Sequence, residues 1–169
     1  RLRAFGVDEV HTGIAKTGLV GVIRGKRSGG SIGLRADMDA LPMQELNSFL
    51  HASKRAKVMH ACGHDGHTTM LLGAARYLAE TRNFAGTVHL IFQPAEEGGG
   101  GGDLMVKEGL FDRFDCDRIF AVHNRPDLEL GKWGTRSGPF MAAADGFTIE
   151  ISGKGGHAAR PHLLCDPMV

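Results

Sequence analysis

The sequence predicts an α/β fold, in which a sheet with flanking helices carries a metal site at one edge. Two observations favour the fold: short apolar runs of strand length alternate with helical patterns, and acidic or histidine residues recur where the apolar runs end. A third observation favours the metal site, because cysteine and histidine side chains gather within the segment Met59–His67.

The first half of the chain contains two predicted strands and a helix. The strands are Leu19–Arg24 and Ser31–Asp39, joined by the polar turn Gly25–Gly30. Residues 43–58 are polar and irregular, so we expect a loop there. A helix is predicted over His67–Thr81, because small and apolar residues recur at helical spacing. These residues are Leu71, Ala74, Ala75, Leu78 and Ala79.

The second half continues the alternation. Thr87–Gln93 is a nearly continuous apolar run, as in a strand that is covered on both faces. Asp103–Phe111 is predicted to be a short helix and Arg118–His123 another strand. Lys132–Ser137 and Gly146–Ser152 are expected to be further strands. Strands that alternate with helices in this way indicate an α/β sheet with helices packed against it.

Polar side chains follow three of the predicted strands at the point where each strand ends. They are Asp37 and Asp39, Glu96 and Glu97, and His123. In open α/β sheets the carboxyl ends of the strands form the edge at which ligands bind. We therefore expect these side chains to converge on one site.

Four side chains of the kinds that bind zinc and its first-row neighbours lie within Met59–His67. They are His60, Cys62, His64 and His67. Cys62 and His64 are separated by one residue, so they can turn toward a single point in a loop. The alternative interpretation is a buried or reactive cysteine, with Cys62 as a nucleophile and His60 or His64 as its base.

The adjacent pair Glu96 and Glu97 can divide two roles that a hydrolytic metal site needs, a ligand and a general base. The alternative is a pair of solvated loop acids, although Pro94 and the glycines that follow make an ordinary exposed loop less fitting. Asp37 and Asp39 alternate along their strand, so they share a face and could orient the metal ligands through hydrogen bonds. The alternative is that they are surface residues at the end of a strand.

Two glycine-rich segments invite other interpretations. Gly98–Gly102 is not a phosphate loop, because no Gly-Lys-Ser/Thr follows it. Gly153–Ala158 matches a degenerate dinucleotide-binding pattern after a predicted strand, which is weak support on its own. His157, within that glycine turn, is instead a candidate for reaching a substrate.

Composition excludes several classes of partner. A net charge of +1 offers no electrostatic attraction for nucleic acid or an anionic membrane surface. No apolar run approaches the roughly 18 residues that span a bilayer. The three cysteines are odd in number and widely spaced, which argues against a disulfide framework and for a reducing compartment.

Both ends of the chain are expected to interrupt structural elements. Arg1–Gly6 has the pattern of a last helical turn closed by glycine, and Asp166–Pro167 is a pair that begins helices. The break at Ser137–Pro139 divides the chain into a first, partial domain, residues 1–139, and the beginning of a second, residues 140–169.

Five motifs carry a resemblance to a known family: Leu34–Pro42, Met59–His67, Gln93–Gly98, Ala121–Asn124 and Gly153–His162. Together they extend over nearly the whole chain in the family's order. They are similar to those of the metal-dependent amidohydrolases that include hippurate hydrolase, N-acyl-amino-acid amidohydrolases and auxin-conjugate hydrolases. Within this family the chain most resembles the proteobacterial hippurate hydrolases.

The resemblance implies an α/β catalytic domain with a dinuclear metal site and a smaller α/β lid domain through which subunits form a homodimer or higher homo-oligomer. Glu96 would be the general base, and His157 would assist at the substrate carbonyl, often in the partner subunit's site. Two divalent ions, zinc, manganese, cobalt or nickel, would be bound with the cysteine as their bridge. Their ligands here would be Cys62, His64, Glu97 and His123.

The activity implied is that of a cytoplasmic enzyme that cleaves N-acyl amino acids to a carboxylic acid and an amino acid. A metal-activated water would give its proton to Glu96, which returns it to the leaving amine. Arg125 stands where an aromatic residue commonly follows His123-Asn124, a departure that concerns the substrate pocket and not the metal site. The family's last metal-binding histidine lies downstream. These 169 residues alone are therefore expected to be inactive. A non-catalytic fragment that binds metal or a partner subunit is the alternative.

Overall fold

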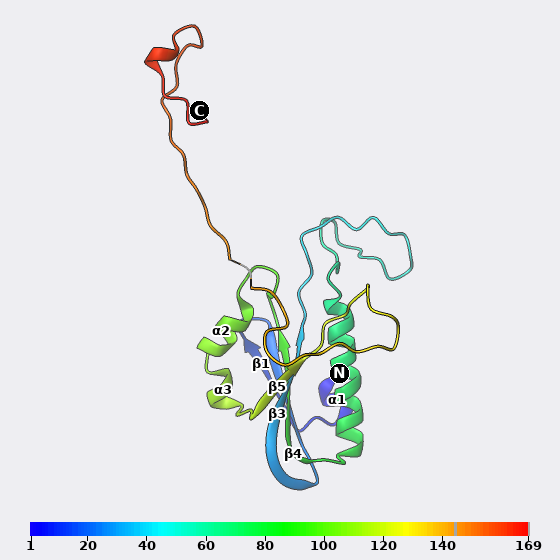
Figure 1. Ribbon diagram of the computed structural model, residues 1–169. Coiled ribbons are helices and arrows are strands. Elements are labelled where there is room, and N and C mark those ends of the chain that lie inside the picture. The colour runs from blue at the N-terminus through cyan, green and yellow to red at the C-terminus, as the bar shows by residue number, and fades with distance from the viewer. Residues whose placement is uncertain (144, 169) are drawn as a thin grey trace. The chain divides into compact units, whose positions relative to one another are not determined.

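The computed structural model describes residues 1–143 and 145–168. The chain divides into two compact units, Arg1–Asp127 and Leu128–Val169, each of which is described by itself. Figure 1 shows the elements in chain order. The first unit contains the 3₁₀ helix η1 (Leu2–Phe5), β1 (Glu9–Ile14), β2 (Gly18–Arg24), β3 (Arg27–Asp37), α1 (His64–Thr81), β4 (Ala85–Gln93), α2 (Gly101–Lys107), α3 (Leu110–Arg113) and β5 (Arg118–Ala121).

The five strands of this unit form one mixed sheet with the order β1-β2-β4-β3-β5. β4 runs parallel to β3, and β3 runs parallel to β5, whereas β1, β2 and β4 pair antiparallel. β4 therefore lies between β2 and β3, so these two strands are not neighbours although they follow each other in the chain. The turn predicted at Gly25–Gly30 is shorter than expected, because β3 already begins at Arg27. The parallel trio β4, β3 and β5 brings three carboxyl ends to one edge of the sheet.

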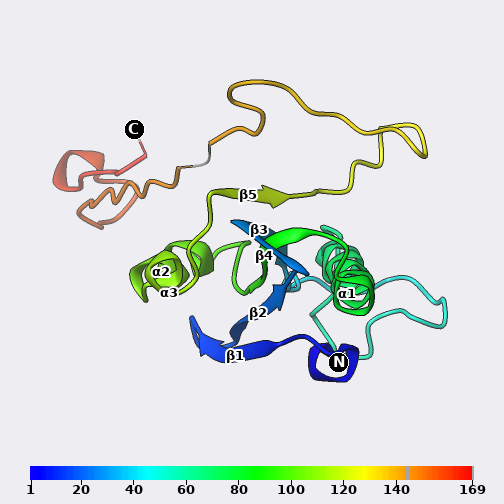
Figure 2. The ribbon, with the colours of Figure 1, turned by 90° about the horizontal axis from the view of Figure 1, so that it is seen from below.

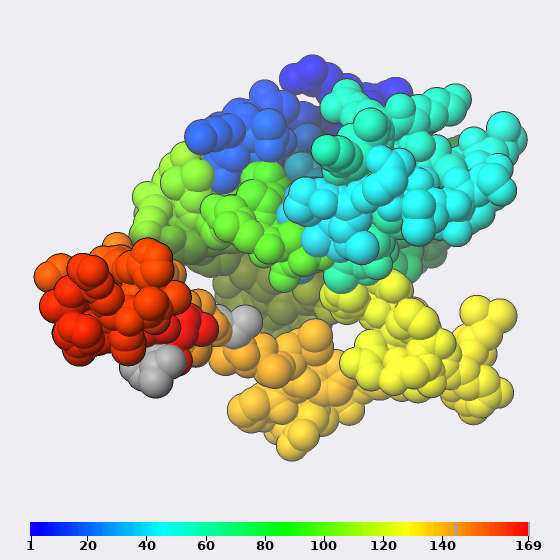
Figure 3. All heavy atoms as spheres, turned by 90° about the horizontal axis from the view of Figure 1, so that it is seen from above, coloured from blue at the N-terminus to red at the C-terminus, as the bar shows by residue number. Residues whose placement is uncertain are grey.

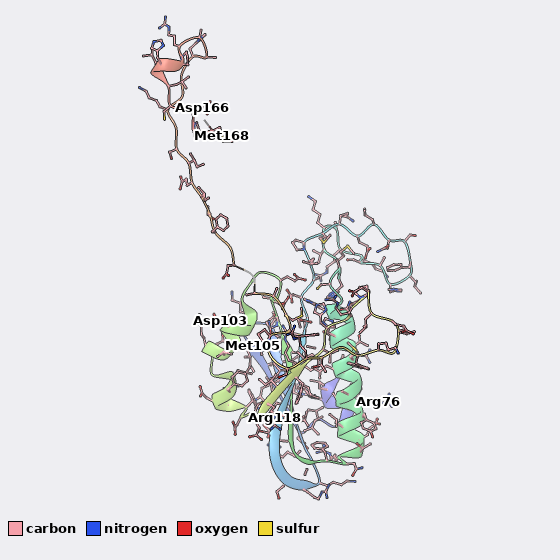
Figure 4. The ribbon with its side chains drawn as sticks, in the orientation of Figure 1. Arg76, Asp103, Met105, Arg118, Asp166 and Met168 are labelled. Carbon is pink, nitrogen blue, oxygen red and sulfur yellow. The ribbon has the colours of Figure 1, made fainter. Side chains whose placement is uncertain are left out.

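Helices cover both faces of the sheet, as Figure 2 shows. On one face Leu71 and Ala75 of α1 pack with Leu90 of β4 in one apolar cluster. On the other face Met105 of α2 joins Ile91 of β4 in a second cluster. In Figure 4 Met105 points from α2 toward the sheet, where it is 1% exposed. Successive β4 residues thus serve opposite faces, as strand geometry requires, and the predicted α/β fold class is confirmed.

Several boundaries differ from those expected. α1 begins at His64, three residues earlier than predicted, because Gly63 adopts the left-handed conformation (φ 94°) that lets the chain enter the helix directly after Cys62. The single helix predicted over Asp103–Phe111 is wrong: Gly109 (φ 82°) separates α2 from α3. β1 was not predicted, because its sequence mixes Glu9, His11 and Thr12 with few apolar residues.

Among its described residues, the second unit holds one regular element, the 3₁₀ helix η2 (Pro161–Leu163), and an isolated bridge between Lys154 and Cys165. The strands predicted at Lys132–Ser137 and Gly146–Ser152 do not form within the described residues. Phe147 and Ile149 alternate as in a strand yet are 87% and 72% exposed. A strand is stable only against a partner strand, and this one has none among the described residues. The predicted domain boundary near residue 140 stays a prediction.

Residues 43–58 form the expected irregular loop after β3, closed at its base by the bridge between Leu41 and Met59. Figure 3 looks down on the molecule and shows this loop, in cyan, at the surface. Within the described part of the chain, no helix combines the length and apolar character needed to cross a bilayer.

Candidate metal centre

The candidate site residues lie on four segments: the end of β3, the start of α1, the turn after β4 and the turn after β5. β4, β3 and β5 are parallel neighbours, so the segments that leave their carboxyl ends meet at one edge. Helix α1 starts at the same edge because it follows the loop from β3. The order of the strands therefore explains why residues far apart in sequence come together.

His64 stands at the middle of this edge and is 1% exposed. Its Nδ1 lies 3.0 Å from the backbone oxygen of Asp39 and 3.3 Å from Oδ1 of the same residue. Both partners accept, so Nδ1 carries the proton and Nε2 carries a free lone pair. Nε2 is buried without a hydrogen-bond partner. A buried acceptor in that state is costly unless something else binds it.

Other possible metal-ligand atoms, carboxylate oxygens and a cysteine sulfur, lie near Nε2 of His64. The Nε2 atom of His64 lies 3.8 Å from Oε2 of Glu96 and 3.8 Å from Oε1 of Glu97. On the other side, Sγ of Cys62 lies 3.4 Å from Nε2 of His123. Cys62, His64 and His123 form one group whose ligand atoms lie within 4.8 Å of one another, and His64, Glu96 and Glu97 form a second. The two groups share His64.

Asp39 ties two of these segments together. It accepts the Nδ1 proton of His64, and its Oδ2 accepts a hydrogen bond of 3.0 Å from the backbone N–H of Glu97. Burial raises the pKa of Asp39, but the backbone N–H groups of Glu97 and Glu96 outweigh it and leave the pKa lowered. A carboxylate that holds a ligand histidine through its second nitrogen fixes which nitrogen faces the metal.

The environment of Cys62 opposes a free thiolate. Burial, a hydrogen bond with Glu97, and the charges of Glu97, Glu96 and Asp37 raise the pKa of the Cys62 thiol to about 11. A nucleophilic cysteine needs the reverse, a lowered pKa from neighbouring cations. A divalent cation among these groups would reverse the effect and draw the sulfur into coordination. The donor set of sulfur, imidazole and carboxylate therefore fits a zinc-like metal better than a cysteine nucleophile.

Asp37 and His67 form a second, deeper pair beside His64. Asp37 is 1% exposed and His67 is 3% exposed. His67 Nδ1 lies 2.6 Å from Asp37 Oδ1, and Arg35 donates to Oδ2 at 2.8 Å. Burial raises the pKa of Asp37, yet the hydrogen bond to His67 and the charge of Arg35 leave it lowered. Sequence reasoning named Asp37 and His67, but not their pairing.

Two other candidates are not joined to this cluster. His157 belongs to the second unit, where its Nδ1 accepts a hydrogen bond of 3.2 Å from the backbone N–H of Ala159. Its expected role at the substrate carbonyl stays a prediction. His60 is exposed and belongs to none of the candidate metal groups among the described residues. Sequence reasoning missed Asn124, which follows His123 and contacts His67, because only the fold brings it there.

The fold and the cluster define an α/β protein with a candidate metal centre of cysteine, histidine and glutamate side chains at the carboxyl edge of its sheet. Residues 33–167 match the model of the peptidase family M20/M25/M40. The chain belongs to this family, as the sequence motifs had indicated.

Curated relatives support the assignment. The hippurate hydrolase of Campylobacter jejuni is 51% identical over 168 residues, which are 99% of this chain and 43% of that protein. The N-acetyl-L-cysteine deacetylase of Bacillus subtilis is 47% identical over 155 residues, 91% of this chain and 37% of that protein. The chain thus spans less than half of the length of these relatives.

A solved structure supports the fold. The crystal structure of Bacillus subtilis YXEP, a dinuclear metal binding peptidase from the M20 family, superposes with a TM-score of 0.76 and 41% identity. The match covers 82% of this chain and 38% of that one. The mixed sheet with helices on both faces is therefore the fold of this family.

Proposed function

We propose that this chain forms part of a two-metal amidohydrolase that cleaves N-acyl amino acids, such as hippurate, to a carboxylic acid and an amino acid. The observation that carries the proposal is the buried Nε2 of His64, which has no hydrogen-bond partner and faces Glu96 and Glu97. Membership of the M20 family and the names of the relatives supply the substrate class.

In this proposal Cys62, His64, Glu97 and His123 would hold two divalent ions. Bound there, zinc, manganese, cobalt or nickel would supply Lewis-acid activation of water and of the amide carbonyl. Asp39 keeps Nδ1 of His64 protonated, so that Nε2 is the nitrogen offered to the centre.

Glu96 is proposed as the general base. Its side chain is 43% exposed, compared with 27% for Glu97, so the Glu96 carboxylate has the better access to water and substrate. It would accept the proton of the attacking water and return it to the departing amine nitrogen. His157 would donate a hydrogen bond to the carbonyl oxygen as charge develops there.

The whole protein is proposed to work as a homodimer or higher homo-oligomer assembled through its second domain, with its small N-acyl amino acid substrate as its ligand. We propose a cytoplasmic location, because a reducing compartment keeps the free cysteine Cys62 available as a ligand.

A chelation experiment tests the proposed function. The natural full-length protein, freed of metal by a chelator and then dialysed, should lose hippurate hydrolysis and regain it on addition of manganese or zinc. The expected loss is several orders of magnitude, because the metal activates the nucleophile. Cysteine alkylation of the metal-loaded enzyme serves as the control for the alternative chemistry. Turnover that survives chelation and is abolished by alkylation would instead support Cys62 as a nucleophile.

A further inference from the structure

His67 is a buried histidine for which the proposed function has no use. It lies one turn after His64 on α1, and both of its ring nitrogens are engaged. Nδ1 lies 2.6 Å from Oδ1 of Asp37, at the end of β3. Nε2 lies 3.1 Å from the backbone nitrogen of Asn124, in the segment that follows β5. The imidazole thus bridges the sheet and the segment that carries His123.

The partners of His67 fix its tautomer. A backbone N–H can only donate, so Nε2 accepts from Asn124 and Nδ1–H donates to Asp37. The amide oxygen Oδ1 of Asn124 lies 2.7 Å from the same Nε2, whereas an accepting nitrogen requires the amide NH₂ group there. The oxygen and nitrogen of an amide exchange places by a half-turn, so its NH₂ group can face the ring. His67 therefore has no lone pair left for a metal ion, although Asp37, His64 and His67 lie close enough to form a candidate group.

Asn124 in turn contacts the other ligand-bearing segment. Its amide lies against Gly63, where an added Cβ would overlap all three end atoms of the amide. Gly63 stands between Cys62 and His64, and Asn124 directly follows His123. Asn124 therefore sits at the junction of the two segments whose Cys62 and His123 approach to 3.4 Å. Whatever holds Asn124 also sets the spacing of those two side chains.

We propose that Asp37 and His67 are a positioning pair, which holds the Asn124 peptide against Gly63 and so keeps His123 opposite Cys62. This inference rests on the proposed function, because it assigns the pair to the geometry of the metal centre. Neither residue binds the metal. The interaction that matters is the one between His67 Nε2 and Asn124, through its backbone N–H and its side-chain amide, and Asp37 serves to present that nitrogen.

Two replacements of His67 distinguish its contact with Asp37 from its contact with Asn124. In His67→Gln the longer amide reaches the place of Nε2, where its oxygen can accept the Asn124 N–H. In His67→Asn the shorter amide takes the place of Nδ1 and can donate to Asp37, but does not reach Asn124. Asn124→Ala is a third variant, at an exposed residue. It removes the amide from Gly63 and from Nε2 of His67, and it leaves the contact between Asp37 and His67 in place.

The measurement is cobalt binding to the natural full-length protein after removal of its metal, followed by the sulfur-to-cobalt absorption band. We expect His67→Gln to keep near wild-type affinity. His67→Asn, His67→Ala and Asn124→Ala should lose about 10- to 100-fold and show a weakened band. His89→Gln is the matched control, since His89 is also buried, at 8% exposure, but on β4 away from the cluster. It should bind cobalt as the wild type does.

Equal affinity in all His67 variants, or rescue by Asn rather than Gln, would overturn the inference while the wild type still binds cobalt. Loss of affinity in His89→Gln equal to that in His67→Asn would also overturn it, because general destabilisation would then explain both. If the wild-type protein binds no cobalt, that result would contradict both the proposed function and this inference.

Discussion

At the residue scale, the adjacent glutamates have the same chemistry and different surroundings. Both lie 3.8 Å from Nε2 of His64, but the Glu96 side chain is 43% exposed and the Glu97 side chain 27%. The Glu97 carboxylate is therefore the more enclosed of the two at the candidate centre. This difference supports the proposal that Glu97 is a ligand and that Glu96 is the base.

Substitution of each glutamate should separate these roles. Glu96→Gln in the full-length protein should keep its metal and lose about 10²–10⁴-fold in kcat, because the base is removed and the ligands are not. Glu97→Gln should lose metal affinity first. Metal content and steady-state kinetics measured on the same preparations make the comparison. Near-normal turnover of Glu96→Gln would show that the base has been misassigned.

The residues that the sequence identified are those whose chemistry is visible without a fold. Cys62, His64 and Glu97 stand in motifs with few other uses. The pairing of His67 with Asn124 could not be predicted, because it joins positions 57 residues apart that only the parallel pairing of β3 and β5 brings together. The close contact between Gly63 and Asn124 could not be predicted for the same reason, because Asn124 belongs to the segment that follows a different element.

At the element scale, helix α1 links the apolar core to the candidate metal centre. Leu71 and Ala75 are buried against the sheet, while His64 and His67 of the first turn face the cluster. The long apolar strand and the amphipathic helix were predictable because each has its own periodicity. Two other outcomes could not be predicted: that β1 forms, and that the described residues Gly146–Ser152 form no strand. Strand formation depends on pairing with other strands, and the local sequence does not show which strands will be adjacent.

The entry into α1 gives a prediction about two glycines. Gly63→Ala should lower both the stability and the metal affinity, because φ is 94° there and the new Cβ would overlap Asn124. Gly73→Ala is the control within the same helix. Nothing lies within 4 Å of its added Cβ, so it should stabilise the protein by about 0.5–1 kcal/mol. Urea unfolding and metal titration measure both effects. Equal responses of the two variants would contradict this account of the helix entry.

At the scale of the whole molecule, the parallel trio β4, β3 and β5 gathers the cluster, but β5 is an edge strand within the described residues. Its Ile119 and Phe120 are 44% and 52% exposed. The chain also spans only 43% of the hippurate hydrolase that it resembles. The family resemblance places a further metal-binding histidine outside these residues.

The isolated 169-residue chain should therefore hydrolyse no hippurate above a metal-only control. A centre that lacks one ligand holds metal loosely, and His157 would lack the rest of its domain to position it. Product release measured beside the full-length protein at equal metal concentration tests this. Robust turnover by the short chain that disappears with a chelator would contradict it.

Anomalous X-ray scattering from crystals of the manganese-loaded full-length protein tests the two-metal centre most directly. We predict two manganese peaks, with Cys62 between them and with His64, Glu97 and His123 as ligands. Glu96 should not be a ligand of either ion, and His67 should remain bound to Asp37 and Asn124. Manganese peaks located elsewhere, or a centre in which Cys62 and Glu97 touch no metal, would contradict the account.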